Sequence, residues 1–176
     1  MLVLLSLLAT PADAARPTDG GQFGYVSGDE VVHWDSPGGI RVHYAVSGPS
    51  VALLDDEDDN GVPDFVELIA THVEGSFAAY DEAGFRRPLH ESDLSLGNLG
   101  GSDAFDVYLV DFGGNSDGAY RNDACRSGVC SGHLLIENDF AGYGYPSLAF
   151  VATPVAELFG TLGAASFLYA VIMPMS

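Results

Sequence analysis

Residues 56–67 of the chain read Asp-Glu-Asp-Asp-Asn-Gly-Val-Pro-Asp-Phe-Val-Glu. This stretch has the spacing of the twelve-residue EF-hand calcium loop, in which positions 1, 3, 5, 7, 9 and 12 supply oxygen ligands. The residues at those positions are Asp56, Asp58, Asn60, Val62 through its carbonyl, Asp64 and Glu67. Gly61 takes position 6, where the sharp turn of the loop needs a residue without a side chain. The stretch therefore predicts a site for one calcium ion.

The charges around this loop also favour a bound cation. Residues 55–67 hold seven carboxylates, and residues 42–85 contain no Lys or Arg. Carboxylates this close repel one another unless a counter-ion is present. The alternative interpretation is a solvated acidic turn in which Asp64 supplies negative charge to the start of a helix. Pro63 lacks the backbone N–H that pairs two EF-hand loops, and the sequence has no second loop, so we expect a single structural site.

Hydrophobic periodicity predicts the elements on either side of the loop. From residue 64 to about residue 83, apolar side chains recur at helical spacing, at Phe65, Ile69, Val73, Phe77 and Tyr80. Gly84 stands where such a helix would be capped. Residues 40–46, 105–111 and 133–137 have the composition of β-strands. The expected fold class is α+β: a small mixed sheet, the long helix after the loop, and a C-terminal apolar helix.

The N-terminal residues have the features of a secretory signal peptide. Residues 2–8 form an apolar run, and residues 12–14 (Ala-Asp-Ala) have the small-x-small form of a cleavage site. The alternative is a buried N-terminal strand or helix. Cys125 and Cys130 are the only cysteines, and export would allow them to form a disulfide. We predict a signal peptide at 1–14, an irregular lead-in at 15–38, and a secreted protein, free or attached to the cell surface.

The overall charge excludes some classes of partner. The chain of 176 residues has 25 Asp and Glu against 6 Arg and no Lys, which gives a formal net charge of -19. Nucleic acids and anionic membrane surfaces repel such a chain. Residues 158–175 carry no charge, and three interpretations stay open for them: a core helix, a membrane anchor, or an altered C-terminus. Nothing in the sequence identifies a protein partner.

Four segments, taken in order, resemble a group of secreted zinc metalloproteases of myxobacterial type. They are residues 42–44 (Val-His-Tyr), residues 58–64 in the acidic loop, residues 105–109 (Phe-Asp-Val-Tyr-Leu) and residues 137–143 (Glu-Asn-Asp-Phe-Ala-Gly-Tyr). The resemblance implies a zincin-like domain over residues 39–176, C-terminally truncated. In that family the last segment leads into a helix carrying His-Glu-x-x-His. Its two histidines bind zinc, and its glutamate activates the zinc-bound water.

This chain departs from the family pattern at the zinc-binding helix. Within residues 151–160, Glu157 matches the general base, but Ala156 and Gly160 stand at the two ligand positions. Neither residue has a side chain that binds metal, so zinc is not expected. Glu157 is then a vestige of the catalytic residue, or a polar residue on an apolar helix. The five histidines are scattered singly, and we expect surface or core roles for all of them: His33, His43, His72, His90 and His133.

Taken together, the residues and the resemblance predict a secreted, calcium-stabilised, metalloprotease-like protein that lacks zinc ligands and is not catalytic. The alternatives are an active zinc-dependent peptidase and a calcium-stabilised surface or binding module. A second calcium site, or ordinary loop polarity, would explain a looser scatter of polar residues, namely Asp103, Asp106, Asp111, Asn115, Asp117 and Asp123.

Overall fold

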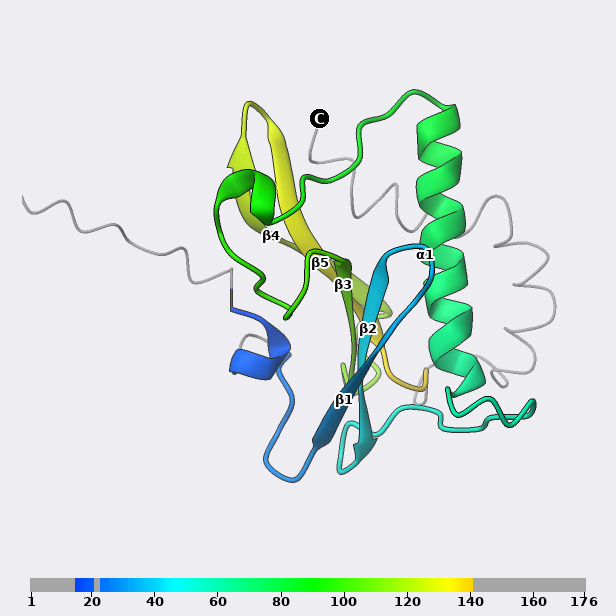
Figure 1. Cartoon of the computed structure of the whole chain (residues 1–176). Helices are drawn as coiled ribbons and strands as arrows, with labels where there is room; N and C mark the ends of the chain where they lie inside the picture. The colour runs from blue at the N-terminus through cyan, green and yellow to red at the C-terminus, as the bar shows by residue number, and fades with distance from the viewer. Residues whose placement is uncertain (1–14, 21–22, 141–176) are drawn as a thin grey trace, which may run out of the picture.

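The structure, a computed structural model, describes residues 15–20 and 23–140. The predicted signal peptide and residues 148–175, with Ala156, Glu157 and Gly160, lie outside the described residues. Figure 1 shows one sheet with one long helix, α1 (Asp64–Glu82), along one side of it. The strands are β1 (Glu30–Asp35), β2 (Ile40–Ser47), β3 (Phe105–Val110), β4 (Gly118–Arg126) and β5 (Val129–Glu137). Two short 3-10 helices complete the secondary structure, η1 (Pro17–Asp19) and η2 (Ser92–Leu94).

The sheet is mixed, with the strand order β1-β2-β3-β5-β4. The three central strands, β2, β3 and β5, run parallel to one another, and the edge strands β1 and β4 are antiparallel to their neighbours. The central strands are almost wholly buried, whereas β1 and β4 are largely half-buried or exposed. This arrangement confirms the predicted α+β class with a small mixed sheet and a long helix after the acidic loop.

The individual elements agree with the sequence where the chain is buried. The predicted helix and the strands at 40–46 and 105–111 correspond to α1, β2 and β3, and β5 begins four residues before the predicted 133. The sequence does not predict β1 or β4. β1 lies inside the expected irregular lead-in of residues 15–38, because an edge strand needs no continuous apolar pattern to pair with its neighbour. The predicted irregular lead-in is therefore wrong for residues 30–35, which form β1.

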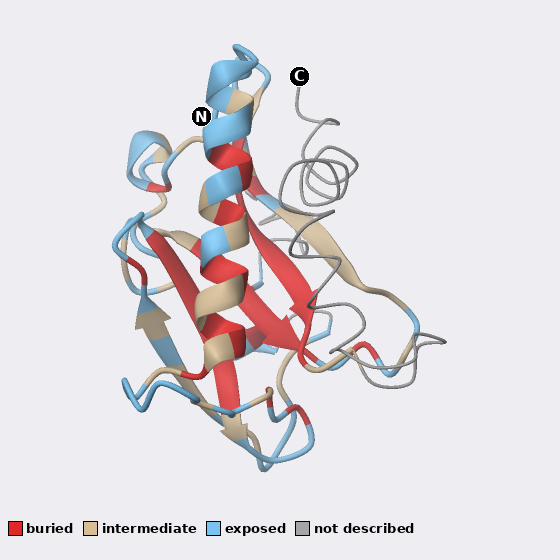
Figure 2. Ribbon diagram, turned by 90° about the vertical axis from the view of Figure 1, so that its right-hand side faces the viewer, coloured by how far each residue is buried: buried red, intermediate tan, exposed pale blue. Residues whose placement is uncertain are grey.

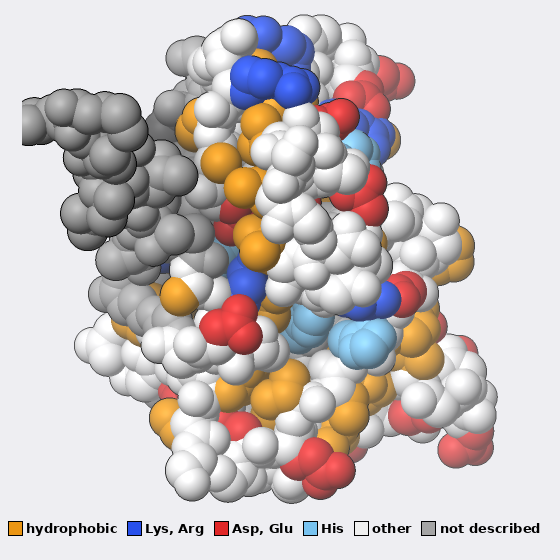
Figure 3. Space-filling model, turned by 60° about the vertical axis from the view of Figure 1, so that its left-hand side comes forward, with side chains coloured by type: hydrophobic (Ala, Val, Ile, Leu, Met, Phe, Trp, Pro, Cys, Tyr) orange, Lys and Arg blue, Asp and Glu red, His pale blue; other side chains and the backbone are white. Residues whose placement is uncertain are grey.

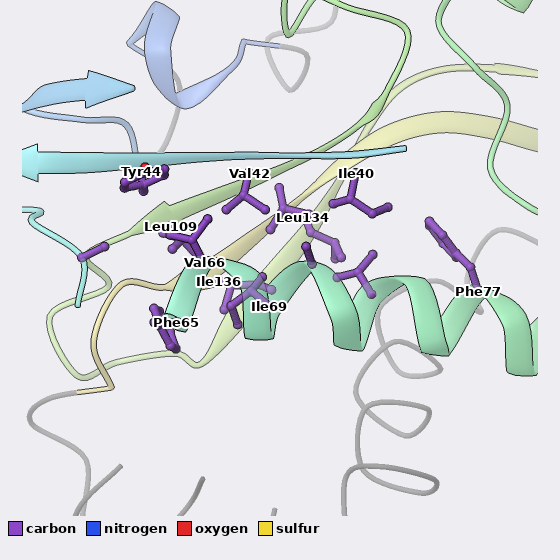
Figure 4. Packing of buried hydrophobic residues seen from close by; sticks show 14 residues of the cluster. Ile40, Val42, Tyr44, Phe65, Val66, Ile69, Phe77, Leu109, Leu134 and Ile136 are labelled. Atoms are coloured by element: carbon purple, nitrogen blue, oxygen red, sulfur yellow. The ribbon is translucent and has the colours of Figure 1, made fainter. Parts of the chain in front are cut away.

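The hydrophobic core lies between α1 and one face of the sheet (Figure 2). Figure 4 shows side chains of the central strands facing those of the helix. The strands contribute Ile40, Val42, Tyr44, Val107, Leu109, Leu134 and Ile136, and the helix contributes Phe65, Val66, Ile69, Ala70, Val73 and Phe77. Each large apolar side chain buried in this way stabilises the fold by about 1.5–3 kcal/mol. The apolar residues that recur at helical spacing in α1 are thus the ones that pack against the sheet.

The start and the end of α1 follow from local sequence. The helix begins after Pro63, which offers no capping side chain, and the N–H of Asp64 instead donates to the carbonyl of Asp55 at 2.9 Å. Asp64 and Glu67 place negative charge in the first turn, where the helix dipole favours it. Gly84, with φ 79°, follows the C-cap residue Ala83 in the left-handed conformation that ends helices. Among the described residues, no helix has the length and apolar character of a membrane span.

A disulfide joins Cys125 to Cys130, which are paired residues of β4 and β5. The bond closes the short turn between the two strands. Replacing both cysteines with serine is expected to lower the free energy of unfolding by about 2 kcal/mol, because so short a loop removes little entropy from the unfolded chain. Thermal unfolding should then show a fall in Tm of about 5 °C. A reductant should lower the wild-type Tm to the same value and leave the variant unchanged; an equal response of both proteins would contradict the prediction.

Candidate metal centre

Three carboxylates of the acidic loop converge in the structure. Single oxygen atoms of Asp56, Asp58 and Asp64 all lie within 4.8 Å of one another. Asp56 and Asp64 are half-buried, and Asp58 is exposed. Calcium binds its oxygen ligands at about 2.3–2.6 Å, so oxygens on opposite sides of the ion are about 5 Å apart. The separations of the three carboxylate oxygens are therefore compatible with their binding one metal ion.

Hydrogen bonds within the loop hold this convergence. The carboxylate of Asp56 accepts the backbone N–H of Asn60 at 3.1 Å and that of Gly61 at 2.8 Å. The carboxylate of Asp64 accepts the N–H of Glu57 at 3.1 Å. Gly61 has φ 88°, a left-handed conformation that glycine adopts without strain. The turn that the sequence predicted from Gly61 is thus the turn that brings positions 1 and 9 together.

Asn60 connects the loop to the helix. Its side-chain amide donates to Asp58 at 3.1 Å and to Glu67, in the first turn of α1, also at 3.1 Å. Its side-chain oxygen accepts the N–H of Val62 at 2.8 Å. The amide therefore bridges positions 3 and 12 of the loop. A bound cation would be contacted by the same two carboxylates.

The two ends of the loop are fixed to the core. Before the loop, Ala52 donates its N–H to the carbonyl of Ala45 in β2 at 3.0 Å, and Asn138, just after β5, donates its side-chain amide to the carbonyl of Val51 at 2.8 Å. Within the loop, the side chain of Val62 packs against the hydrophobic core. The exposed acidic turn is thus anchored at both ends by buried residues, and Phe65 is buried directly after the last aspartate of the loop.

The loop carboxylates have no cationic partner in the described part of the chain. None of the salt bridges there involves a residue between 55 and 67. Their hydrogen-bond donors are backbone N–H groups and the amide of Asn60. Of the six predicted ligand residues, the structure brings the carboxylates of Asp56, Asp58 and Asp64 together, whereas Glu67 is outside this group and is connected to it by the amide of Asn60. The described contacts supply no positive charge to balance the carboxylates. The donor set contains only oxygen, which suits a hard cation.

The scattered acidic residues beyond the loop do not form a second centre of this kind. Among residues 15–20 and 23–140, the acidic loop is the only group of three potential ligands at metal-binding separation. Asp103 accepts hydrogen bonds from Ser92, and Asp111 accepts the N–H of Gly113. Asp106 and Asp123 instead meet around Arg16, on the sheet face opposite α1. Sequence reasoning missed this second grouping, because its members come from distant segments.

Comparison of the chain with known protein families, with curated proteins and with solved structures found no match. The resemblance to secreted metalloproteases therefore stays a prediction. Its first three segments lie on β2, in the acidic loop and on β3, and its fourth begins at Glu137, the last residue of β5.

Proposed function

We propose that residues 56–67 bind one calcium ion and that this ion stabilises the domain by fixing the start of α1. The observation that carries the proposal is the convergence of Asp56, Asp58 and Asp64 within 4.8 Å, in a loop that has an oxygen donor at every EF-hand position. Calcium is favoured over zinc because the loop contains no histidine or cysteine. It is favoured over magnesium because Glu67 can add a bidentate carboxylate, which calcium accepts more readily.

The position of the loop explains how the ion would act on stability. Asp64 and Glu67 are in the first turn of α1, and the residues between them, Phe65 and Val66, are buried in the core. An ion held by Asp64 and Glu67 on one side and by Asp56 and Asp58 on the other would join the loop to the helix. It would also remove the repulsion among the loop carboxylates. Unfolding the start of α1 would then require loss of the ion.

For the whole chain, the proposal is a secreted, metalloprotease-like domain that lacks zinc ligands and has no peptidase activity. It rests on the four resembling segments and on Ala156 and Gly160 at the two ligand positions. Such a domain would serve as a calcium-stabilised module of the extracellular or cell-surface space. Hydrolysis of a peptide that is abolished by a chelator, restored by zinc and lost in Glu157→Gln would contradict this part of the proposal.

Titration of the purified protein with calcium and, separately, with zinc tests the metal site. We expect one calcium ion per chain, with a Kd of roughly 10⁻⁴ to 10⁻³ M. At about 10 mM calcium, such a site adds about 2 kcal/mol to the free energy of unfolding, which raises Tm by about 5 °C. Zinc should bind without defined stoichiometry. Absence of calcium binding would contradict the site, and one tightly bound zinc ion would favour the peptidase interpretation instead.

A further inference from the structure

The sheet face opposite α1 is charged near its centre, where the side chain of Arg16 is buried. Arg16 is 1% exposed, and its Nη2 atom donates to Asp123 at 2.9 Å, contacts Glu91, and lies 3.6 Å from Asp106. The three carboxylates are also buried. They come from the segment before η2, from β3 and from β4. Figure 3 brings the left-hand side of Figure 1 forward and shows acidic, arginine and histidine side chains on its surface, whereas the four side chains of this cluster are buried.

Two histidines hold the carboxylates in place. His43 on β2 has its Nε2 atom 2.8 Å from Asp106, and His133 on β5 has its Nδ1 atom 3.3 Å from Asp123. Both imidazoles are buried, and the ring of His43 stacks on that of Tyr108 with 4.2 Å between centroids. Glu91 is fixed by the N–H of Leu99, which donates to its second oxygen at 2.5 Å. The carboxylates are thus oriented by groups other than Arg16.

Arg16 supplies the only guanidinium that contacts all three carboxylates of this cluster. Three carboxylates face one guanidinium, and burial lowers the pKa of His133, which keeps that imidazole neutral. The same burial raises the pKa of Glu91. Burying a charged carboxylate costs several kcal/mol of desolvation free energy unless a cation lies close to it. Arg16 is the cation that contacts all three, so the burial of this face depends on it.

Arg16 reaches the cluster from a short N-terminal arm. It is 75 residues from Glu91 and 107 residues from Asp123 in the sequence. Ala15 is exposed, and η1 follows directly, with the carbonyl of Pro17 accepting the N–H of Tyr25 at 3.2 Å. The Nε and Nη1 atoms of Arg16 are buried without a hydrogen-bond partner. The contacts of Arg16 with the three carboxylates are therefore all made by Nη2, and no bidentate pair forms.

We propose that Glu91, Asp106 and Asp123 form a socket that binds a guanidinium group, and that Arg16 is its in-chain ligand. Residues 15–19 are then a strap that closes this face of the sheet when Arg16 enters the socket. The ligand class is a monovalent organic cation with a guanidinium head. A signal peptide cleaved after Ala14 would leave Arg16 in the exported chain, so the predicted processing site is compatible with a working strap.

Truncation of Arg16 and chemical rescue test the socket. Arg16→Ala is expected to lower Tm by about 10 °C, because three buried carboxylates lose their cation. Millimolar N-propylguanidinium should raise the Tm of this variant and leave the wild type unchanged, and propylammonium should rescue less, since it does not fill the guanidinium volume. Arg86→Ala, which removes an exposed arginine, is the matched control and should leave Tm unchanged. A Tm for Arg16→Ala within the range of the control would overturn the proposal.

The effect of Glu91→Gln on Tm should have opposite signs in the wild type and in Arg16→Ala if Arg16 acts by charge pairing, but not if it acts only by packing. Glu91→Gln removes a carboxylate charge but keeps an oxygen that can accept the N–H of Leu99. In the wild type this change should lower Tm, because Arg16 loses a partner. In the Arg16→Ala background it should raise Tm, or restore folding if the single variant does not fold, because one unpaired buried charge is removed. A double variant no more stable than Arg16→Ala would overturn the proposal.

Discussion

Replacing Asp56 with alanine is expected to weaken calcium binding by more than about tenfold and to remove the rise in Tm that we expect calcium to cause in the wild type. Asp56 occupies the first ligand position, and its two oxygens also accept the N–H groups of Asn60 and Gly61. The substitution therefore removes a charged ligand and releases the turn that places the others. Thermal unfolding with calcium and with a chelator measures the effect as the difference between two Tm values.

Glu67→Ala should have the same effect from the other end of the loop, because it removes the ligand that belongs to α1. Asp59→Asn is the matched control. Asp59 is exposed, lies outside the ligand positions and has φ 56°, a left-handed conformation that asparagine tolerates. The control removes one loop charge and no ligand, so most of the calcium response should persist. An undiminished response in both alanine variants would contradict the site, and an equal loss in the control would indicate nonspecific charge screening.

The acidic loop could be predicted from the sequence because its proposed ligands are neighbours in the chain. Twelve consecutive residues supply every oxygen, so spacing alone predicts which side chains converge. The Arg16 socket could not be predicted in this way, because its carboxylates are separated from Arg16 by as many as 107 residues in the sequence. One signal was present: Asp106, His43 and His133 are charged or polar residues within strands whose other members include long apolar side chains. A polar residue in a buried strand needs a partner, but the sequence does not say which one.

The elements of the fold also differ in whether local sequence patterns or contacts with distant segments determine them. β2, β3 and α1 are predictable because burial imposes a regular apolar pattern on them: one face of the helix, alternate residues at the start of β2, and most of β3. β1 and β4 pair along one edge only and stay half-exposed, so their polar residues resemble loops. Their strand character comes from hydrogen bonding to β2 and β5, which is tertiary information.

The two sheet faces are stabilised by different physical effects. On the α1 face, apolar packing dominates, and the acidic loop limits the freedom of the helix start. On the other face, a smaller apolar cluster of Tyr108, Val110, Phe112 and Leu135 lies beside the buried carboxylates that contact Arg16. Calcium should therefore stabilise the first face and leave the Arg16 contacts unchanged, so the losses of Tm from Asp56→Ala and Arg16→Ala should add when the two are combined.

Phe77→Ala is expected to lower the free energy of unfolding by about 3 kcal/mol, and Tm by about 10 °C. Phe77 is buried near the end of α1, and its ring meets that of Phe105 edge-on with 5.0 Å between centroids. It also borders a cavity of about 400 Å³, and water entering there keeps the loss at the lower end of the range for phenylalanine.

Phe77 lies thirteen residues after Asp64, which corresponds to about 20 Å of helix. The substitution should therefore leave the calcium-dependent rise in Tm unchanged, because the ion and the ring act on opposite ends of α1. Phe85→Ala, in which a 42% exposed ring is removed just beyond the helix, is the control and should change the free energy of unfolding by less than about 1 kcal/mol. A calcium response that disappears in Phe77→Ala would mean that α1 unfolds as one unit with the loop, and the ion would then stabilise the whole helix rather than its first turn.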